Sequence, residues 1–354
     1  ENLNFFINNL IITNAFKKII FKAPKIEILL TEFRKIICIK IANNEETISE
    51  TLTKFIITMS HQCFLNEYIY YYTDEERKAI KNIINSCKTN NCTIEKLSIL
   101  SCYFSLYKLI NEIPSIKSFR TSNQSFQKLM KIQISEPQIE YELSKNIRNI
   151  GEIKDKTSLK VRTQYEENPY PRWTSADSLY KKKLTVSQVI NDEICPNYIN
   201  KDLGNETTQI LIAGCGTGQQ IMYAQKYRNA KITCIDLSLA SLAYAQRKIN
   251  DLEITNVELI LMDILETKLL ETKFDIIESS GVLHHMYEPL KGLKALVNIL
   301  KPNGLINLGL YSELARTNIT FTKNYIKRNK IRTDFKSMRN FRKKIISGET
   351  KDLN

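Results

Sequence analysis

The sequence predicts an α/β protein: a Rossmann-like, mostly parallel sheet with helices on both faces, preceded by an all-helical N-terminal domain. None of the ten glycines comes before Gly151, and a long stretch without glycine is typical of helices, whose interiors avoid this residue. From Thr208 onward, apolar strand patterns alternate with segments of helical length. This alternation is typical of parallel sheets covered by helices.

The N-terminal part shows several helix starts. Thr47-Ile48-Ser49-Glu50 and Thr73-Asp74-Glu75-Glu76 both match the capping box, in which the Thr hydroxyl and the Glu carboxylate bind free backbone N–H groups. Thr93 begins a third segment of this kind, and apolar residues at helical spacing follow each start. These patterns predict a helical domain over residues 1–150.

The C-terminal part contains five candidate strands. They are Thr208–Ala213, Lys231–Ile235, Val257–Met262, Phe274–Ser279 and Leu305–Leu310. Helices are predicted between them, over Gln220–Arg228, Leu239–Asn250 and Leu290–Leu300. Pro302-Asn303-Gly304 predicts a turn before the fifth strand.

A glycine-rich loop follows the first strand. It contains Gly214, Gly216 and Gly218, and the second strand ends on Asp236. Glycine permits a sharp turn and the close approach of a ligand, the N–H groups that open the next helix favour an anionic group, and a carboxylate at the second strand's end can bind a ribose diol. The pattern therefore predicts a nucleotide-cofactor loop. A dinucleotide fingerprint would need glycine where Gln219 stands, so the spacing disfavours NAD.

Two further strand ends carry suitable chemistry. Asp263 and Ile264 follow the third strand, and Ser279-Ser280-Gly281-Val282-Leu283-His284-His285 ends the fourth. Ligands of open parallel sheets bind beyond the carboxyl ends of the strands. We therefore expect these residues and the glycine loop to form one site.

Residues 165–312 resemble class I S-adenosylmethionine (SAM) dependent methyltransferases in these motifs. The resemblance implies methyl transfer, with SAM as the cofactor. It places the glycines at the methionine portion, Asp236 at the ribose hydroxyls and Asp263 at the adenine amino group. The cofactor-binding residues that it implies are Gly214, Cys215, Gly216, Gly218, Asp236, Leu237, Asp263, Ile264 and Ser279.

A narrower resemblance extends into other segments. Gln164–Trp173, Gly309–Arg316 and Cys63–Tyr68 resemble bacterial methyltransferases that are often fused to tetratricopeptide repeats. Many family members have an acidic residue two positions before the first glycine, where this chain has Ile212. The family sheet usually continues for two more strands, whereas residues 313–354 show only helical patterns. We therefore expect a truncated C-terminal segment and a fifth strand at an exposed edge.

His284 and His285 are the candidate catalytic residues. The resemblance places them where the methyl acceptor approaches the sulfonium, and His can take a proton near neutral pH. A base is needed only if the acceptor is protonated. The alternative is a structural His pair that is hydrogen-bonded to the backbone of its loop.

The segment between the two halves is rich in aromatic residues and proline. Within Tyr165–Trp173, two prolines one residue apart prevent a regular helix and favour an extended path. We expect residues 151–200 to be a linker and lid over the cofactor, with Trp173 reporting on SAM binding. A linker whose aromatic residues merely pack on the next domain is the alternative.

The net charge of +13 is concentrated near the C-terminus. Residues 321–346 contain ten basic residues against one acid, Asp334. This segment predicts an anionic partner or RNA, since such patches attract polyanions. Two amphipathic helices with lysines facing water are the alternative, because Ile, Asn and Lys are frequent throughout the chain.

Cysteine usage and hydropathy restrict the protein class. The eight cysteines form no C-x-x-C pairs and have few histidines near them, which predicts neither zinc nor a disulfide framework. Scattered thiols are typical of the reducing cytoplasm, and no apolar run is long enough to span a membrane. We expect a cytoplasmic enzyme that does not contact the membrane.

The sequence therefore divides into four predicted segments. They are a helical domain (1–150), the linker and lid (151–200), a SAM-binding methyltransferase domain (201–312) and a basic helical segment (313–354). The predicted function is SAM-dependent methyl transfer to an unidentified acceptor. Alternatives are a SAM-binding scaffold or regulatory protein without activity, and an enzyme that uses SAM or a nucleotide for other chemistry, such as aminopropyl transfer.

Overall fold

The computed structural model describes residues 8–44, 48–89, 91–174, 183–199 and 207–350. It divides into two compact units. The helical unit is formed by Glu1–Gln138 with Glu313–Asn354, and the sheet unit by Ile139–Ser312. Two of the predicted segments, the first and the last, thus contribute to one unit; the four-segment division itself stays a prediction.

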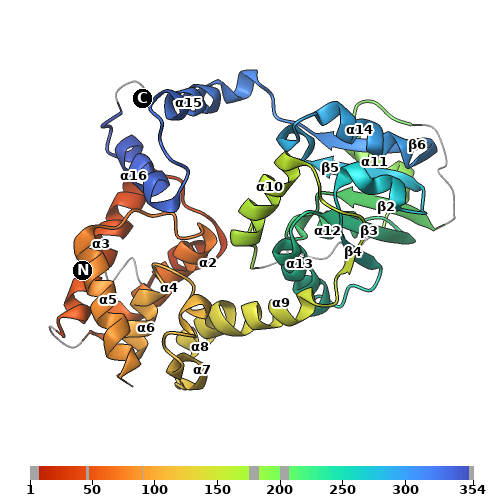
Figure 1. Ribbon diagram of the computed structural model, residues 1–354. Coiled ribbons are helices and arrows are strands. Elements are labelled where there is room, and N and C mark those ends of the chain that lie inside the picture. Colours follow the sequence, from red (N-terminus) through yellow and green to blue (C-terminus); the bar gives the residue numbers. More distant parts are fainter. Residues whose placement is uncertain (1–7, 45–47, 90, 175–182, 200–206, 351–354) are drawn as a thin grey trace. The chain divides into compact units, whose positions relative to one another are not determined.

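The described part of the helical unit contains no strand, which confirms the predicted N-terminal helical region (Figure 1). Its helices are α2 (Leu10–Lys18), α3 (Pro24–Ala42), α4 (Glu50–Leu65), α5 (Asp74–Lys88), α6 (Ile94–Leu100), η1 (Leu106–Leu109), α7 (Ser115–Ser118), α8 (Gln124–Met130), η2 (Lys131–Ser135), η5 (Leu314–Arg316), α15 (Thr317–Arg328) and α16 (Phe335–Ile346). Helix α9 (Glu136–Ser144) begins in this unit and continues into the sheet unit.

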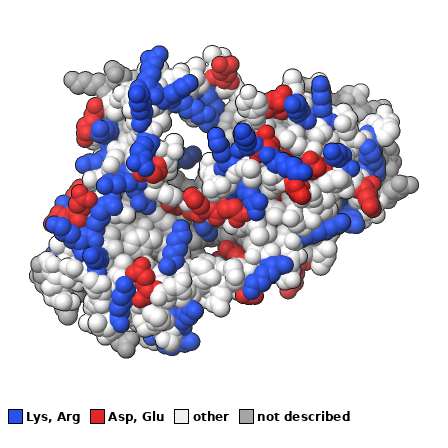
Figure 2. Space-filling model, in the orientation of Figure 1, with Lys and Arg blue, Asp and Glu red and all other residues white. Residues whose placement is uncertain are grey.

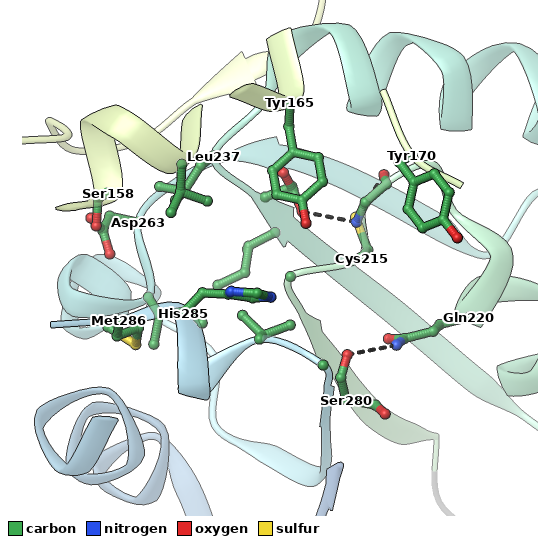
Figure 3. A pocket seen from close by; sticks show the side chains of 18 of the residues that line it. Ser158, Tyr165, Tyr170, Cys215, Gln220, Leu237, Asp263, Ser280, His285 and Met286 are labelled. Atoms are coloured by element: carbon green, nitrogen blue, oxygen red, sulfur yellow. Dashed lines mark hydrogen bonds between the residues drawn. The ribbon is translucent and has the colours of Figure 1, made fainter. Parts of the chain in front are cut away.

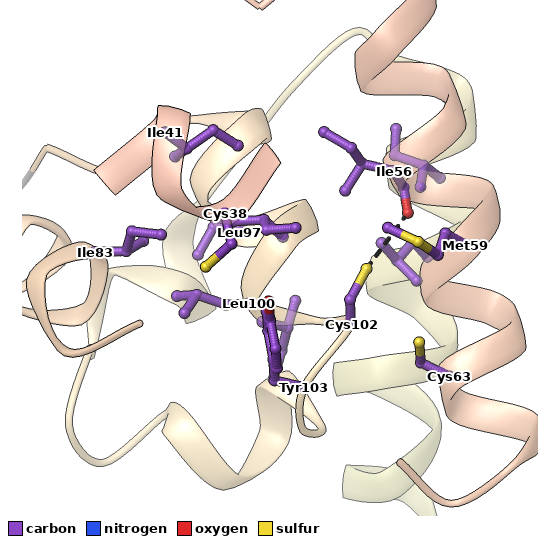
Figure 4. Close-up of a cluster of buried hydrophobic side chains, with 14 of the residues drawn as sticks. Cys38, Ile41, Ile56, Met59, Cys63, Ile83, Leu97, Leu100, Cys102 and Tyr103 are labelled. Atoms are coloured by element: carbon purple, nitrogen blue, oxygen red, sulfur yellow. Dashed lines mark hydrogen bonds between the residues drawn. The ribbon is translucent and has the colours of Figure 1, made fainter. Parts of the chain in front are cut away.

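The core of the helical unit is built around α4. Ile56, Met59 and Cys63 of this helix are fully buried. Figure 4 shows them beside the apolar side chains of α3 and α6. Cys102 lies in the same core, where its thiol donates to the carbonyl of Ile56 over 3.7 Å. This burial supplies the main driving force for folding of the unit.

Of the predicted helix starts, those at Thr73 and Thr93 are confirmed. Thr73 and Glu76 form the capping box at α5, and the Thr93 hydroxyl accepts from the backbone at the start of α6. The prediction at Thr47 is wrong, because α4 begins at Glu50 and its N-cap is Ser49, whose hydroxyl accepts from the third helical N–H. Thr47 itself lies outside the described residues.

The sheet unit contains a six-stranded sheet in the order β1-β4-β3-β2-β5-β6, with every neighbouring pair parallel. The strands are β1 (Arg148–Asn149), β2 (Thr208–Ala213), β3 (Ala230–Asp236), β4 (Val257–Leu261), β5 (Phe274–Ser280) and β6 (Leu300–Gly309). All five predicted strands are confirmed. In the described part of the chain, β6 is the last strand and lies at one edge.

Helices cover both faces of this sheet, as predicted. Alternate residues of β2 point to opposite faces, so Ile210 and Ile212 belong to one core cluster and Leu211 and Ala213 to the other. The first face packs against α11 (Val186–Ile194), α12 (Gln219–Ala224) and α13 (Leu239–Asp251). The second packs against η3 (Ile264–Leu269), η4 (Leu283–His285) and α14 (Pro289–Asn298).

One local prediction in this unit is wrong, and one region contains a helix that was not predicted. Helix α10 (Lys156–Glu167) lies within the predicted linker and lid and ends before the prolines at positions 169 and 171. Pro302-Asn303-Gly304 does not precede the last strand but forms an irregularity within β6. There Phe274 pairs with Leu300, and the next register partner on β6 is Leu305.

Helix α16 packs within the helical unit through part of its basic side chains. Arg339 donates to the carbonyl oxygen of Tyr68 over 2.6 Å, and the Arg342 guanidinium binds Glu27 at the same distance. Phe341 is buried and stacks on Tyr325 of α15, with ring centroids 5.8 Å apart. Part of the predicted basic segment therefore has a structural role in this unit.

No helix in the described ranges is long and apolar enough to cross a membrane. The described histidines, cysteines and acidic residues also form no group of three that could hold a metal ion.

Candidate active site

The loop after β2 has the backbone conformation that its glycines permit. Gly214, Gly216 and Gly218 all have positive φ, at 81°, 52° and 86°, where other residues are strained. A Cβ on Gly214 would lie 2.4 Å from Val282, and one on Gly218 would lie 2.8 Å from the Ala245 Cβ. Gly216 has only a backbone oxygen nearby, at 3.4 Å, and it is the glycine that a ligand can approach.

Asp236 connects the glycine loop to the end of β3. One carboxylate oxygen accepts from the Gly216 N–H at 2.8 Å, and the other accepts from the Ser238 N–H at 2.9 Å. Burial raises the pKa of Asp236, while these backbone hydrogen bonds oppose the rise. A carboxylate can accept about four hydrogen bonds, so the side chain has capacity for a ligand.

Asp263 occupies the corresponding place after β4. The side chain is buried, and one oxygen caps η3 by accepting from the Leu265 N–H at 2.9 Å. Leu237, Met262 and Ile264 supply apolar walls beside the two carboxylates. Two acceptor groups beside an apolar wall suit a ribose and a flat purine ring.

These strand ends surround a cavity of about 290 Å³ (Figure 3), near the lower limit of small-molecule sites, roughly 300–1,000 Å³. The predicted site residues that line it are Gly214, Cys215, Gly216, Asp236, Leu237, Asp263, Ile264 and His285. The structure therefore brings together most of the predicted site. Among the described lining residues, none is a lysine or arginine.

Three predicted site residues do not line the cavity. Gly218 is the N-cap of α12 and packs closely on α13. Ser279 is buried, and its hydroxyl donates to the Ala213 carbonyl at 3.1 Å, which connects β5 to β2. His284 stacks on Tyr311, with ring centroids 3.6 Å apart.

His285 differs from its neighbour because its ring points toward the middle of the cavity (Figure 3). The side chain is exposed and lines the cavity together with Met286. The two imidazole centroids are only 4.4 Å apart, yet they face different surroundings. The geometry therefore favours His285 over His284 as the residue that meets an acceptor.

Helix α10 and the segment after it, which lie in the predicted linker and lid, contribute side chains to the cavity beyond the predicted cofactor-binding residues. Ser158, Val161 and Tyr165 lie on one face of α10, at spacings of three and four residues, and all line the cavity. Tyr170 and Pro171 follow. In the sequence, the aromatic residues of Tyr165–Trp173 indicate these contacts. Ser280, Gly281 and Val282, from the segment expected at the end of the fourth strand, also line the cavity. The lining residues that were not predicted are Gln219, Gln220, Ile235, Met262, Met286 and Tyr311.

Glu166 holds α10 in place over the site. Its carboxylate accepts from the backbone N–H groups of Leu239 and Ala240, at 2.7 and 3.0 Å. These are the first amides of α13, where free N–H groups and the helix dipole favour a negative charge. Helix α10 is thereby attached to the element that directly follows Asp236.

Trp173 holds the end of the same segment against the glycine loop. Its indole N–H donates to the Thr217 carbonyl at 3.0 Å, and the Thr217 hydroxyl donates to the Pro171 carbonyl at 2.5 Å. Trp173 is 8% exposed and does not line the cavity. Protein atoms already shield this ring, so its fluorescence reports on the loop rather than on direct ligand contact.

We expect Glu166→Gln to loosen α10, because an amide can accept at only one of the two positions. A hydrogen bond contributes about 0.5–1.5 kcal/mol, so ligand affinity should fall roughly 2- to 12-fold. Calorimetry and limited proteolysis within residues 156–167 measure this. Glu167→Gln, at an exposed neighbour, is the control. Equal affinity and equal proteolysis of the two variants would show that Glu166 does not hold the helix.

Comparison with known proteins places this site in a family. Residues 211–308 match the family model described as a methyltransferase domain. The segment is a class I SAM-dependent methyltransferase domain. SAM is the cofactor of this domain.

Relatives of the methyltransferase domain are similar over part of their length. The chain is 36% identical over 113 residues to an uncharacterized protein of Synechococcus sp., covering 31% of this chain and 27% of that protein. It is 29% identical over 112 residues to the tRNA U34 carboxymethyltransferase of Campylobacter curvus, covering 32% and 37%. The structure of PKMT2 from Rickettsia typhi in complex with AdoHcy is 26% identical, with a TM-score of 0.33 over 39% of this chain and 28% of that one. The chain thus spans less than two fifths of these proteins.

The residues of the methyltransferase domain fit SAM. The carboxylates of Asp236 and Asp263 are acceptors of the kind that ribose hydroxyls and an adenine amino group need, and the apolar walls suit a purine. A Cβ on Gly281, which lines the cavity, would meet no atom within 4 Å, so this part is open to a ligand. The acidic residues of the described lining are not accompanied there by lysine or arginine, which suits a cofactor whose sulfur is positively charged.

Proposed function

We propose that this chain transfers the methyl group of SAM to an acceptor that approaches past His285 and Tyr311. The observation that carries the proposal is the single cavity in which Asp236, Asp263 and Gly216 lie together with an exposed imidazole. The match of residues 211–308 to a methyltransferase domain supports it.

The protein's tasks in such a reaction are few. When bound, SAM supplies a methyl group on a positively charged sulfur that is its own leaving group. Asp236 and Asp263 hold the adenosine part, and α10 excludes water on its side of the cavity. His285 takes a proton if the acceptor carries one. Alignment of acceptor and methyl carbon is the main contribution expected of the remaining lining residues.

The second candidate function is SAM binding without turnover, in a scaffold or regulatory protein. Ile212 favours it, because this buried residue stands where related enzymes often have an acid. Formation of S-adenosylhomocysteine (SAH) separates the two candidates. Incubation with methyl-labelled SAM and cell extract should yield SAH and a labelled product, and SAM binding without SAH would favour the scaffold.

Two finer expectations belong to this proposal. The first is that the chain is related to methyltransferases that are fused to tetratricopeptide repeats. Tyr165, Tyr170 and Tyr311 support it, because they lie in the segments that resemble those enzymes and line the cavity. A cytoplasmic location is the other. The thiols of the described cysteines are free, which supports a reducing compartment.

A further inference from the structure

A ligand with the methionine part of SAM brings an ammonium group into the cavity. An ammonium has three N–H donors, which need acceptors when water is excluded. Ile212 is 0% exposed and packs in the core on the face of β2 that meets α12. It can accept no hydrogen bond, so another group must do so.

Gln220, which lines the cavity, carries a possible acceptor for this ammonium group. Its side-chain oxygen is buried and has no hydrogen-bond partner among the described residues. Its side-chain nitrogen donates to the backbone carbonyl of Ser280 at 3.2 Å. The opposite amide orientation would place two oxygens against each other, so this contact fixes which atom faces away from Ser280.

The position of Gln220 fits the methionine part rather than the adenosine. Figure 3 shows Gln220 and Ser280 at the opposite end of the cavity from Asp263 and Ser158. Gly214 and Gly216 also line the cavity. The two lining carboxylates come from elsewhere, since Asp236 ends β3 and Asp263 follows β4. Gln219 and Gln220 come from α12, after the glycine loop, and of these two Gln220 has the buried oxygen without a partner.

We infer that the side-chain oxygen of Gln220 accepts a hydrogen bond from the ammonium group of SAM, in place of the acid that Ile212 replaces. The contact with Ser280 holds the amide in the required orientation before the ligand arrives. This inference rests on the proposed SAM binding and adds a residue that selects ligands by their amino group.

A pair of ligands tests the inference without any methyl acceptor. SAH and its analogue with hydrogen in place of the amino group are titrated by calorimetry into the full chain and into Gln220→Leu. Hydrogen bonds to charged groups are strong, so the substitution should weaken SAH binding roughly tenfold. The deaminated analogue should bind both proteins with affinities within about twofold, because its partner atom is missing. Gln246→Leu, the same change on α13 at a residue that does not line the cavity, is the matched control and should leave both ligands unaffected.

Three other outcomes separate the possible failures. Equal weakening of both ligands in Gln220→Leu would show that Gln220 only shapes the cavity, and would overturn the inference. Equal affinity of the unchanged protein for both ligands would also overturn it. Failure of the unchanged protein to bind SAH at all would instead contradict the proposed function.

The helical unit carries a second, independent inference at the turn between α15 and α16. An open hollow at this turn is lined by Lys323, Lys327, Lys330 and Arg332, with Asp334 as its only acid. The Asp334 carboxylate already accepts from the Ser337 N–H and hydroxyl, both at 3.0 Å. Figure 2 shows Lys and Arg side chains gathered over the region of α15 and α16.

The arrangement of these cations favours nucleic acid over an acidic protein. Lys323 and Lys327 are four residues apart and thus share one face of α15, about 6 Å apart along its axis. Lys330 and Arg332 follow beyond the end of the helix and line the same hollow. Lysine acts as a point charge, which suits a row of phosphates, whereas bidentate carboxylate binding needs arginine.

We propose that this basic hollow binds RNA through its phosphates. The test is the fluorescence anisotropy of a labelled oligouridine RNA at increasing salt. Replacing Lys323, Lys327 and Lys330 with Gln should weaken binding about tenfold at low salt and reduce the slope of log affinity against log salt by about 2, since each phosphate contact contributes about 0.7.

A second triple variant provides the control. Replacing the exposed Lys25, Lys78 and Lys81 of the same unit with Gln removes the same net charge and should change binding by less than about twofold. Equal losses in both triple variants would show a general charge effect and overturn the proposal. Absence of RNA binding at low salt, or equally strong binding of polyglutamate, would also overturn it.

Discussion

Replacing Asp236 with alanine is expected to lower SAM affinity by roughly 10- to 150-fold, since hydrogen bonds to a charged group contribute about 1.5–3 kcal/mol. The carboxylate lines the cavity and also holds the Gly216 and Ser238 amides. The variant therefore loses both a ligand contact and a support of the glycine loop. Calorimetry with SAM measures the change.

Two measurements separate these effects. The melting temperature of Asp236→Ala without ligand reports the loss of the loop contacts, and Asp192→Ala, at an exposed residue, controls for charge. Unchanged SAM affinity in Asp236→Ala would contradict the assignment, and preference for NAD over SAM would contradict the family.

The same carboxylate predicts a pH dependence. Burial raises the pKa of Asp236 above its usual range. Because the charged form is the better acceptor, SAM affinity should fall as the pH is lowered through this raised pKa. The fall should begin at a higher pH than for an exposed Asp, whose pKa is about 3.9. Binding measured across this range in the Asp236→Ala variant should lack the transition.

Replacing His285 with asparagine is expected to lower turnover by roughly 100- to 10,000-fold if His285 acts as a general base. SAM affinity should stay nearly unchanged, because the proposed contacts with the adenosine part come from Asp236 and Asp263. Figure 3 shows the His285 ring pointing into the cavity, across from the Tyr165 side chain of α10. SAH formation in cell extract measures the rate.

His284→Asn is the matched control for this prediction. The His284 ring stacks on Tyr311. Its replacement should therefore lower the melting temperature and leave the turnover rate nearly unchanged. The assignment would be wrong if both variants lost SAM binding and stability together with no separate effect on turnover. The acceptor would then reach the site with a lone pair already free.

The sheet was largely predictable because each buried strand corresponds to a short, continuous segment of the sequence. Each of β2 to β6 contains an apolar run, and the chemistry at the strand ends follows from the order of parallel strands. Strand β1 was missed because only two residues pair with β4, too few for a pattern. Helix α10 was not predicted, because the prolines at 169 and 171 favour an extended path just after it.

The site was predictable where its residues follow strands directly, and less so elsewhere. Asp236 and Asp263 stand at strand ends, so their place in the cavity follows from the topology. Gln220 and Tyr311 reach the cavity from a helix and from the segment after the edge strand, and only the folded chain brings them together. For His284 and His285, the sequence places both on one loop, but ring orientation depends on packing against Tyr311.

The attachment of α10 to α13 has a kinetic consequence. Glu166 must release two backbone amides before α10 can move away from the cavity. Helix and loop movements of this kind take microseconds to milliseconds and often limit turnover. If α10 must move for SAH to leave, the residence time of SAH is set partly by this movement, and weakening the attachment shortens it. A variant that binds SAM less tightly can then turn over faster. Its turnover rate should also depend less on solvent viscosity than the turnover rate of the unchanged protein does.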